Sequence, residues 1–324
     1  MDLLRFEPIY QDRVWGGNNL HTDLGRAIPT DNPIGEAWDI VDRPEAQSVC
    51  IQSRKPLSEI LSDSKDTIMG PTWSSASGRF PILVKWLDCQ DRLSLQVHPP
   101  ADVADLLNGE PKTECWFIAK AKPQAHLFLG LKATVTQAEF ERVLTDSGGS
   151  GLTPLIHRVP VKDGDSILLE SGRIHAIDAG NLILEIQQNS DTTYRVYDWD
   201  RVGLDGQPRQ LHIEQSLRSI DFNDFEPKLT PSDFESQHRV IAQCDAFRIR
   251  QINLKEGEFI DIASKIEPSI ISVINGEMET RKEVTQHQQV LRCAENVLCP
   301  YSWGGRLIAR EKTTLLLTDR FLQA

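Results

Sequence analysis

The stretch Leu93–Ile118, LSLQVHPPADVADLLNGEPKTECWFI, has the pattern of two strands joined by a turn-rich loop. Polar and apolar residues alternate at its start, and side chains two positions apart point to the same side of a strand. Ser94, Gln96 and His98 therefore share one face of the first strand. Glu114 begins the second strand, so the loop can return it to the side of His98. A polar inner face of this kind favours a metal site, because zinc accepts imidazole and carboxylate or amide oxygen ligands.

A third ligand for such a metal is available in His175. The segment from Gly164 to His175 reads Gly-Asp-(x)5-Ser-Gly-x-x-His and resembles the second motif of cupin barrels, with Ser171 where proline is usual. A barrel that closes on itself could place His175 opposite His98. Taken alone, however, a histidine on a strand is more often a core or surface residue than a ligand.

The residues on either side of this stretch predict a mainly β protein. The apolar run Phe80–Leu87 leads into it, and short strands separated by glycine and aspartate turns follow between residues 158 and 199 and again from 239 to 318. Leu57, Ile60 and Leu61 predict a short helix, and Thr136–Leu144 predicts a second one with a capping box.

We therefore expect two cupin-type (jelly-roll) β-barrels with a small helical insert, at about residues 54–75 and 99–150. The first domain would span residues 1–230 and hold the catalytic site. The second, residues 231–324, would be cupin-like without a metal site, and the segment Pro227–Ser232 is the expected linker.

The composition limits the possible partners. The chain has 324 residues and a formal net charge of −12, which argues against binding to nucleic acid or to an anionic membrane. The N-terminus lacks the pattern of a signal peptide, and no apolar run approaches the ~20 residues of a membrane span. The six cysteines form no Cys-x-x-Cys pair, which is typical of reduced thiols. We expect a cytoplasmic protein.

Several motifs occur in order along the chain, between about residues 6 and 215. They are Trp15-Gly16-Gly17, Gly35-Glu36-Ala37-Trp38, Phe80–Lys85, Leu93–Pro99, Lys112–Trp116, Gly172–Ile177 and Ser190–Asp198. Together they resemble the class I mannose-6-phosphate isomerases (phosphomannose isomerases) in their short bacterial form, whereas the C-terminal third matches only in general cupin character. Ser171 and Cys89 depart from the family pattern, and neither touches the expected chemistry.

The resemblance implies one zinc ion per chain and a set of residues around it. The implied zinc ligands are Gln96, His98, Glu114 and His175. The implied catalytic residues are Arg195, Glu185 and Lys112, and the implied substrate-binding residues are Ser94, Lys112 and Arg195. Without the family context, Arg195 is better explained by a surface ion pair with Asp191 or Asp198, and Glu185 is equally well explained by a solvated strand position.

The implied reaction is the reversible conversion of mannose 6-phosphate to fructose 6-phosphate. A proton leaves C2 and returns to C1 through an enediol(ate), whose charge zinc stabilises as a Lewis acid. Two alternatives remain open at this stage. One is a non-catalytic metal-binding cupin that senses or binds sugar phosphates. The other is an iron cupin dioxygenase, although Gln96 stands where iron cupins usually place a histidine. We expect a small-molecule sugar phosphate as partner, and a monomer or weak homodimer.

Overall fold

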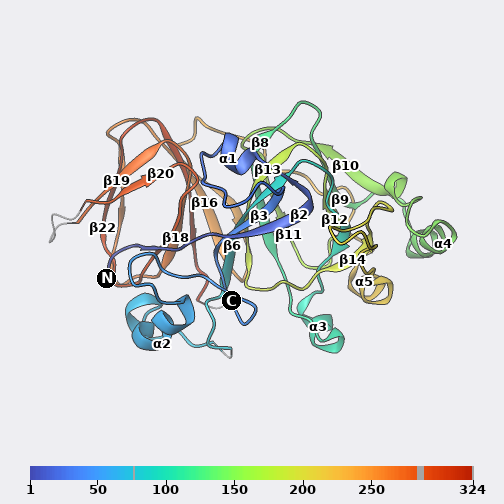
Figure 1. Ribbon diagram of the computed structural model, residues 1–324, viewed down its shortest axis with the longest axis horizontal. Coiled ribbons are helices and arrows are strands. Elements are labelled where there is room, and N and C mark those ends of the chain that lie inside the picture. The colour runs from blue at the N-terminus through green and yellow to red at the C-terminus, as the bar shows by residue number, and fades with distance from the viewer. Residues whose placement is uncertain (76, 283–287, 323–324) are drawn as a thin grey trace. The chain divides into compact units, whose positions relative to one another are not determined.

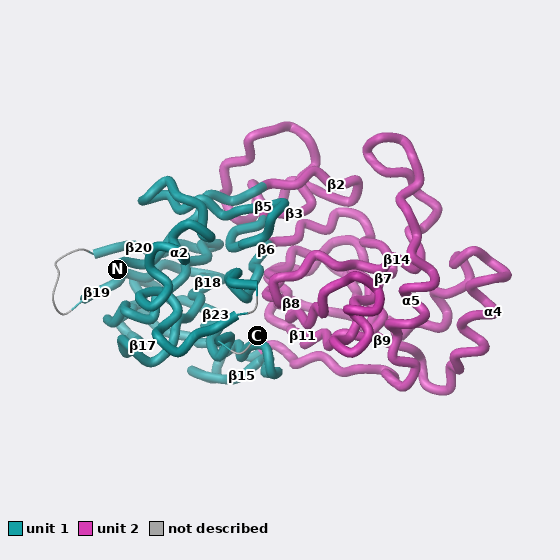
Figure 2. The backbone as a smooth tube through the Cα atoms, turned by 90° about the horizontal axis from the view of Figure 1, so that it is seen from below, with its two compact units in different colours: residues 1–9, 38–85, 233–324 teal, residues 10–37, 86–232 magenta. Residues whose placement is uncertain are grey.

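The computed structural model describes residues 1–75, 77–282 and 288–322, and β-strands make up most of its regular structure (Figure 1). The expectation of a mainly β protein is confirmed. The chain divides into two compact units, and neither is a single continuous segment (Figure 2). Unit 1 consists of residues 1–9, 38–85 and 233–324, and unit 2 consists of residues 10–37 and 86–232.

Two sheets organise unit 2. The first is six-stranded, and its order is β11 (Ser166–Leu169), β8 (Glu114–Ala121), β13 (Asn181–Gln188), β6 (Ile82–Cys89), β3 (Ile34–Ile40) and β2 (Ile9–Gly17). The second is five-stranded, and its order is β10 (Ile156–Pro160), β9 (His126–Leu131), β12 (His175–Ile177), β7 (Leu95–Val97) and β14 (Tyr194–Tyr197). The chain passes between the units inside β2, inside β3, inside β6 and again after Ser232.

The two sheets of unit 2 pack face to face over an apolar core. Trp116 and Ile183 of the first sheet lie in one buried cluster with Leu129 and Ile177 of the second. Burial of each such side chain stabilises the fold by about 1.5–3 kcal/mol. Polar side chains that point inward on the same strands therefore lie at the edge of this core, between the sheets.

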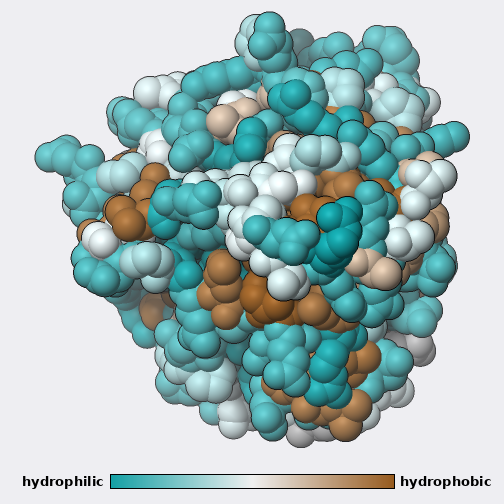
Figure 3. Space-filling view, turned by 90° about the vertical axis from the view of Figure 1, so that its right-hand side faces the viewer, coloured by the Kyte–Doolittle hydropathy of each residue, from teal (hydrophilic) through white to brown (hydrophobic). Residues whose placement is uncertain are grey.

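Helices cover the outer face of the second sheet. Leu95 and Val97 of β7 lie in a separate buried cluster with Phe140 and Leu144 of α4 (Gln137–Ser147). Because side chains alternate along a strand, Gln96 points the opposite way, toward the first sheet. The other helices of unit 2 are α1 (Asn19–Thr22), α3 (Ala101–Ala104), η1 (Asp105–Leu107), η2 (Thr153–Leu155) and α5 (Ile213–Ser219). Apolar side chains are still visible between hydrophilic ones on the side of the molecule that carries α4 and α5 (Figure 3).

Unit 1 also contains two larger sheets. One has the order β1 (Leu4–Arg5), β21 (Asn296–Cys299), β18 (Ser269–Asn275), β23 (Thr313–Asp319), β16 (Arg248–Leu254) and β15 (His238–Gln243). The other has the order β17 (Phe259–Ile262), β22 (Gly305–Ala309), β19 (Glu277–Arg281) and β20 (Val290–Arg292). A small pair, β4 (Asp42–Arg43) and β5 (Ala46–Gln47), and the helix α2 (Leu57–Ile68) complete the unit.

The structure confirms the expected helices, whereas the expected barrels and domain boundary stay predictions. The helices α2 and α4 form where the sequence predicts them, and Thr136 caps α4 by accepting a hydrogen bond from the Glu139 amide at 3.2 Å. No sheet closes on itself among the described residues, so the jelly-roll barrels stay a prediction, as does the division at residue 230. In the described part of the chain, every helix is too short or too polar to cross a bilayer.

Candidate active site

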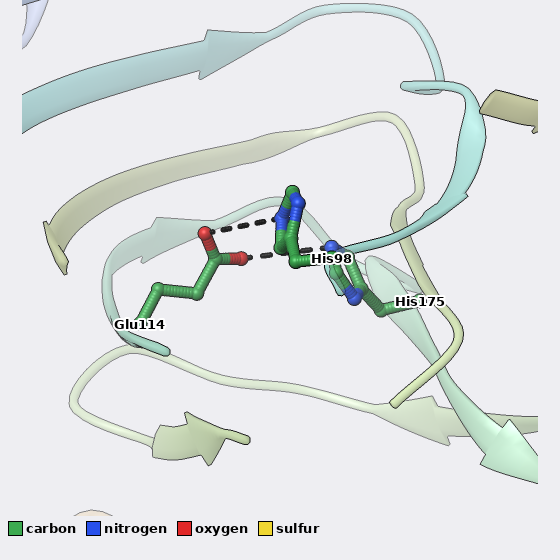
Figure 4. Close-up of side chains that lie close together, drawn as sticks. All are labelled: His98, Glu114 and His175. Carbon is green, nitrogen blue, oxygen red and sulfur yellow. Dashed lines mark ion pairs between the residues drawn. The ribbon is translucent and has the colours of Figure 1, made fainter. Parts of the chain in front are cut away.

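Three side chains predicted as metal ligands meet between the sheets of unit 2. His98 follows β7, Glu114 begins β8 and His175 begins β12. Their ligating atoms all lie within 4.8 Å of one another, and each side chain is at most 2 % exposed. Glu114 Oε2 is 3.4 Å from His98 Nε2, and Glu114 Oε1 is 3.6 Å from His175 Nε2 (Figure 4). This is the donor set of a divalent metal site.

Strand register places two further predicted residues beside this group. Gln96 of β7 is directly opposite His175 of β12 on one side and opposite Arg195 of β14 on the other. Directly opposed residues of antiparallel strands share a face, so all three side chains line the same surface. The Gln96 amide nitrogen is 3.2 Å from His175 Nε2, and its oxygen accepts a hydrogen bond from the Ser94 hydroxyl at 3.2 Å.

Both histidines present the same nitrogen to the site. His98 Nδ1 lies 2.8 Å from the Thr192 carbonyl oxygen, and His175 Nδ1 lies 2.9 Å from that of Arg173. A carbonyl only accepts hydrogen bonds, so Nδ1 carries the hydrogen and Nε2 keeps its lone pair for a metal. Burial, and then the Lys112 ammonium, lower the pKa of His98. Burial, and then the neighbouring His98, lower the pKa of His175 to about 3. Both rings are neutral at pH 7.

Glu114 is a buried anion without a hydrogen bond. Neither carboxylate oxygen has a hydrogen-bond partner, although the Lys112 ammonium lies 3.0 Å from Oε2. Burial alone would raise the pKa of Glu114, but the Lys112 ammonium beside it holds that pKa well below its usual range. A desolvated carboxylate without hydrogen bonds is costly, by about 1–3 kcal/mol or more. These two oxygens therefore fit a cation held between them and the two imidazoles.

Lys112 and Glu185 lie next to the three candidate ligands. The Lys112 ammonium is 3.3 Å from His98 Nε2 and 3.7 Å from Glu185 Oε1. Glu185 is 3 % exposed, and its Oε2 accepts a hydrogen bond from Trp116 Nε1 at 2.9 Å. The alternative of a solvated strand position for Glu185 is therefore wrong.

Arg195 makes neither of the ion pairs that the sequence left open. Among the described residues no carboxylate pairs with Arg195, and Asp198 instead binds Arg201 and Arg209. Arg195 Nη1 donates to the Gln210 carbonyl oxygen at 2.7 Å, while its buried Nε has no hydrogen-bond partner. Its guanidinium therefore keeps donors available for an anionic ligand.

Sequence reasoning missed several groups that hold these residues in place. The carbonyls of Thr192 and Arg173 are backbone groups, for which the sequence carries no signal. Trp116 could have been found, because it shares a strand face with Glu114 two positions earlier. Ser171, the departure from the cupin motif, accepts a hydrogen bond from the Lys112 amide at 3.1 Å and so positions that lysine.

Comparisons with known proteins find similar sequences of one kind. The family model for the catalytic domain of type I phosphomannose isomerase matches residues 3–111. The chain is 38% identical over 254 residues to the probable mannose-6-phosphate isomerase GmuF of Bacillus subtilis, covering 76% of this chain and 78% of that protein. It is 33% identical over 306 residues to the mannose-6-phosphate isomerase ManA of Bacillus subtilis, covering 93% of this chain and 94% of that protein.

A solved crystal structure has a fold similar to that of this chain. The crystal structure of the mannose 6-phosphate isomerase from Bacillus subtilis superposes with a TM-score of 0.85 at 27% identity, covering 98% of this chain and 99% of that chain. The likeness thus extends over nearly the whole of both chains, with the His–Glu–His group inside it. The chain belongs to the type I mannose-6-phosphate isomerases, a family of aldose–ketose isomerases.

Proposed function

We propose that this protein is a zinc-dependent isomerase that interconverts mannose 6-phosphate and fructose 6-phosphate through an enediol(ate). The observation that carries the proposal is the Glu114 carboxylate, buried without a hydrogen bond between two neutral imidazoles. The relatives named as mannose-6-phosphate isomerases support the substrate.

His98, Glu114 and His175 would hold the metal, with Gln96 beside them as a fourth ligand. Imidazole, carboxylate and amide donors suit zinc, and no thiolate is required. When bound, the ion supplies Lewis-acid stabilisation of the negative charge that develops on the sugar oxygens.

Two buried groups are suited to the proton transfer between C2 and C1. Glu185 is a carboxylate fixed by the Trp116 indole, and it can take the proton from C2 and return it to C1. Lys112, a buried point charge, can donate to the sugar oxygen on which charge develops. A positioned general base typically contributes about 10²–10⁴-fold, so Glu185→Gln is expected to lower kcat within that range.

Arg195 and Ser94 are assigned to substrate binding. A guanidinium is always charged and can bind a phosphate or an oxyanion through two parallel hydrogen bonds. Arg195 of β14 is directly opposite Gln96 of β7, and this register supports the assignment because opposed residues share a strand face. Ser94 is buried immediately before β7, and its hydroxyl donates to the Gln96 amide oxygen at 3.2 Å.

The deciding experiment is a coupled assay of the purified protein with mannose 6-phosphate, together with its metal content. Turnover is expected before chelation, to be lost on chelation and to return with added zinc. His175→Ala is expected to lose both metal and turnover, and Arg195→Ala to keep the metal and lose turnover. Normal activity of Arg195→Ala would contradict its role. A metal-loaded protein without turnover would indicate a sensor, and stoichiometric iron would indicate an oxygenase.

A further inference from the structure

The 199–212 loop runs back along the sheet edge to Arg195. The strand β14 is the last strand of the five-stranded sheet, so one side of it has no strand partner there. The loop ends beside that side. The His212 amide donates to the Arg195 carbonyl at 2.8 Å, and the Arg195 amide donates to His212 Nδ1 at 3.2 Å. Gln210, near the end of the loop, accepts the hydrogen bond from Arg195 Nη1.

Asp198, the residue before this loop, binds one arginine near the start of the loop and one near its end. The Asp198 side chain is buried and binds two arginines of the loop through its carboxylate. Arg209 donates from Nε to Oδ2 at 2.7 Å and from Nη2 to Oδ1 at 2.5 Å. Arg201 donates to Oδ1 from Nε at 3.2 Å and from Nη2 at 3.0 Å. The Arg209 pair is bidentate, with one hydrogen bond to each carboxylate oxygen, and such pairs are strong and fix orientation as well as distance.

The turn that begins the loop is strained and firmly held. Trp199 and Asp200 have φ angles of 60° and 54°, a left-handed conformation that costs a non-glycine residue roughly 1–3 kcal/mol. Trp199 Nε1 donates to the Leu93 carbonyl oxygen at 2.6 Å, and the Tyr197 hydroxyl donates to Asp200 Oδ2 at 2.7 Å. Strain persists only where the surrounding contacts over-determine it. The direction in which the loop leaves β14 is therefore fixed by the structure around it.

We propose that Asp198 is a positioning residue for the isomerase reaction: by binding Arg209 it fixes the Gln210 carbonyl, which in turn holds the Arg195 guanidinium in place. This inference rests on the proposed role of Arg195. The Arg195 side chain has no carboxylate partner among the described residues, and its Nη1 is held by the Gln210 carbonyl oxygen. A free arginine side chain carries about 2 kcal/mol of rotamer entropy, and fixing it in advance removes that cost from substrate binding.

The charge of Asp198 also affects the pKa of Arg195. Burial, and then the nearby charges of Arg209 and Arg201, lower the pKa of Arg195, while the charge of Asp198 raises it. Although burial raises the pKa of Asp198, its bonds to Arg209 and Arg201 lower it overall, so the carboxylate is charged at pH 7. Loss of this charge leaves Arg201 and Arg209 without their shared anion and removes a negative charge that raises the pKa of Arg195.

The test compares Asp198→Asn with a matched control, Asp319→Asn. Asp319 in unit 1 is 2 % exposed and is bound by Arg248 through two hydrogen bonds of 2.8 Å and by Arg250 at 2.5 Å. Both variants remove a buried carboxylate charge shared by two arginines. Metal content, melting temperature, kcat and KM for mannose 6-phosphate are measured on the zinc-loaded enzyme.

We expect Asp198→Asn to lower kcat/KM roughly 10- to 100-fold at unchanged metal content, the scale of a misplaced group at an active site. Asp319→Asn is expected to lower the melting temperature and to leave kcat/KM within about twofold of wild type. In an Arg195→Ala background, Asp198→Asn is expected to leave the residual kcat/KM of that variant unchanged, because the two residues act as one unit.

The outcomes separate this inference from the proposed function. Wild-type kcat/KM in Asp198→Asn overturns the positioning role, and so does a full additional loss in the Arg195→Ala background. Normal activity of Arg195→Ala alone refutes the role of Arg195 instead. If Asp198→Asn does not fold, Arg209→Ala and Arg209→Lys replace it, since the Arg209 side chain is 25% exposed. Partial rescue by lysine relative to alanine supports the inference, and equal wild-type activity of both variants overturns it.

Discussion

The burial of His175 makes the metal-free protein sensitive to acid. Burial, and then His98, lower its pKa to about 3, whereas a histidine in the unfolded chain titrates near about 6.5. Between these two values the unfolded chain binds a proton that the folded chain does not bind. The stabilisation is therefore complete above about pH 6.5, and the free energy of unfolding falls by about 1.4 kcal/mol per pH unit below it, down to about pH 3. Urea unfolding of the chelated protein at several pH values measures this slope.

Two variants separate His175 from the other groups that titrate in acid. Glu114 and Asp198 also have lowered pKa values and lose stabilisation as the pH falls, so the wild-type slope alone does not identify His175. His175→Gln is expected to give a shallower slope, and His238→Gln, at an exposed histidine, a slope parallel to wild type. Equal slopes for His175→Gln and wild type would refute the explanation.

The sequence predicted the residues of the site better than their contacts. Alternation placed Gln96 and His98 on one face, and the family motifs indicated Glu114 and His175, which the structure brings within 4.8 Å of His98. The sequence could not show that Arg195 avoids Asp198, because Asp198 is taken by Arg209, eleven positions later in a turn-rich loop. Competition among neighbouring arginines for one carboxylate depends on the path of the backbone.

At the scale of the element, the first turn of α4 depends on Thr136. Its hydroxyl oxygen accepts a hydrogen bond from the Glu139 amide, one of the amides at a helix start that have no partner within the helix. Thr136→Ala is expected to lower the free energy of unfolding by about 1 kcal/mol. Urea unfolding of the purified variant measures the change, and kcat is expected to stay at the wild-type value.

A second threonine of the same helix provides the control. The Thr145 hydroxyl donates to the Glu141 carbonyl oxygen at 2.8 Å, inside the helix and on its exposed side. Alanine has the higher helix propensity at such a position, so Thr145→Ala is expected to leave stability unchanged or slightly raised. A loss as large as that of Thr136→Ala would show that the capping bond is not the cause.

Elements were easier to predict from the sequence than their pairing. The helix periodicity from Leu57 and the cap at Thr136 are local signals, and both helices form. The pairing of β12 with β7 and β9 rests on strands of three to six residues that are far apart in the chain. Which short strand pairs with which depends on tertiary packing, for which the alternation pattern carries no information.

At the scale of the molecule, unit 1 is assembled from three separate segments. Leu4 of β1 pairs with Leu298 of β21, and the Asn296 side chain donates to Asp39 Oδ2 at 2.6 Å. The Tyr301 amide donates to the carbonyl oxygen of Ile68 at the end of α2. The composition showed a linker-like segment at 227–232. It gave no sign of these contacts, because the residues on both sides of each contact look like ordinary core or turn residues in the sequence.

This assembly makes a truncated chain of residues 1–232 unstable. Removal of residues 233–324 takes away the partners of residues 1–9 and 38–85, which form the rest of unit 1. Leu3 is fully buried in a cluster whose other members lie at residues 252–317, and the ring of Phe80, also fully buried, packs edge-on against Phe321 at 5.5 Å. Exposed apolar surface of this kind favours aggregation.

We therefore expect the 1–232 fragment to be insoluble when expressed alone, and to become soluble when residues 233–324 are co-expressed as a second chain. Solubility, circular dichroism and the cooperativity of urea unfolding are the measurements. A soluble 1–232 fragment that unfolds cooperatively and binds one zinc ion would show that the division expected at residue 230 is also a folding boundary. Aggregation that co-expression reverses would show that the catalytic unit needs the completed unit 1, because the two units share the strands β3 and β6 along the chain.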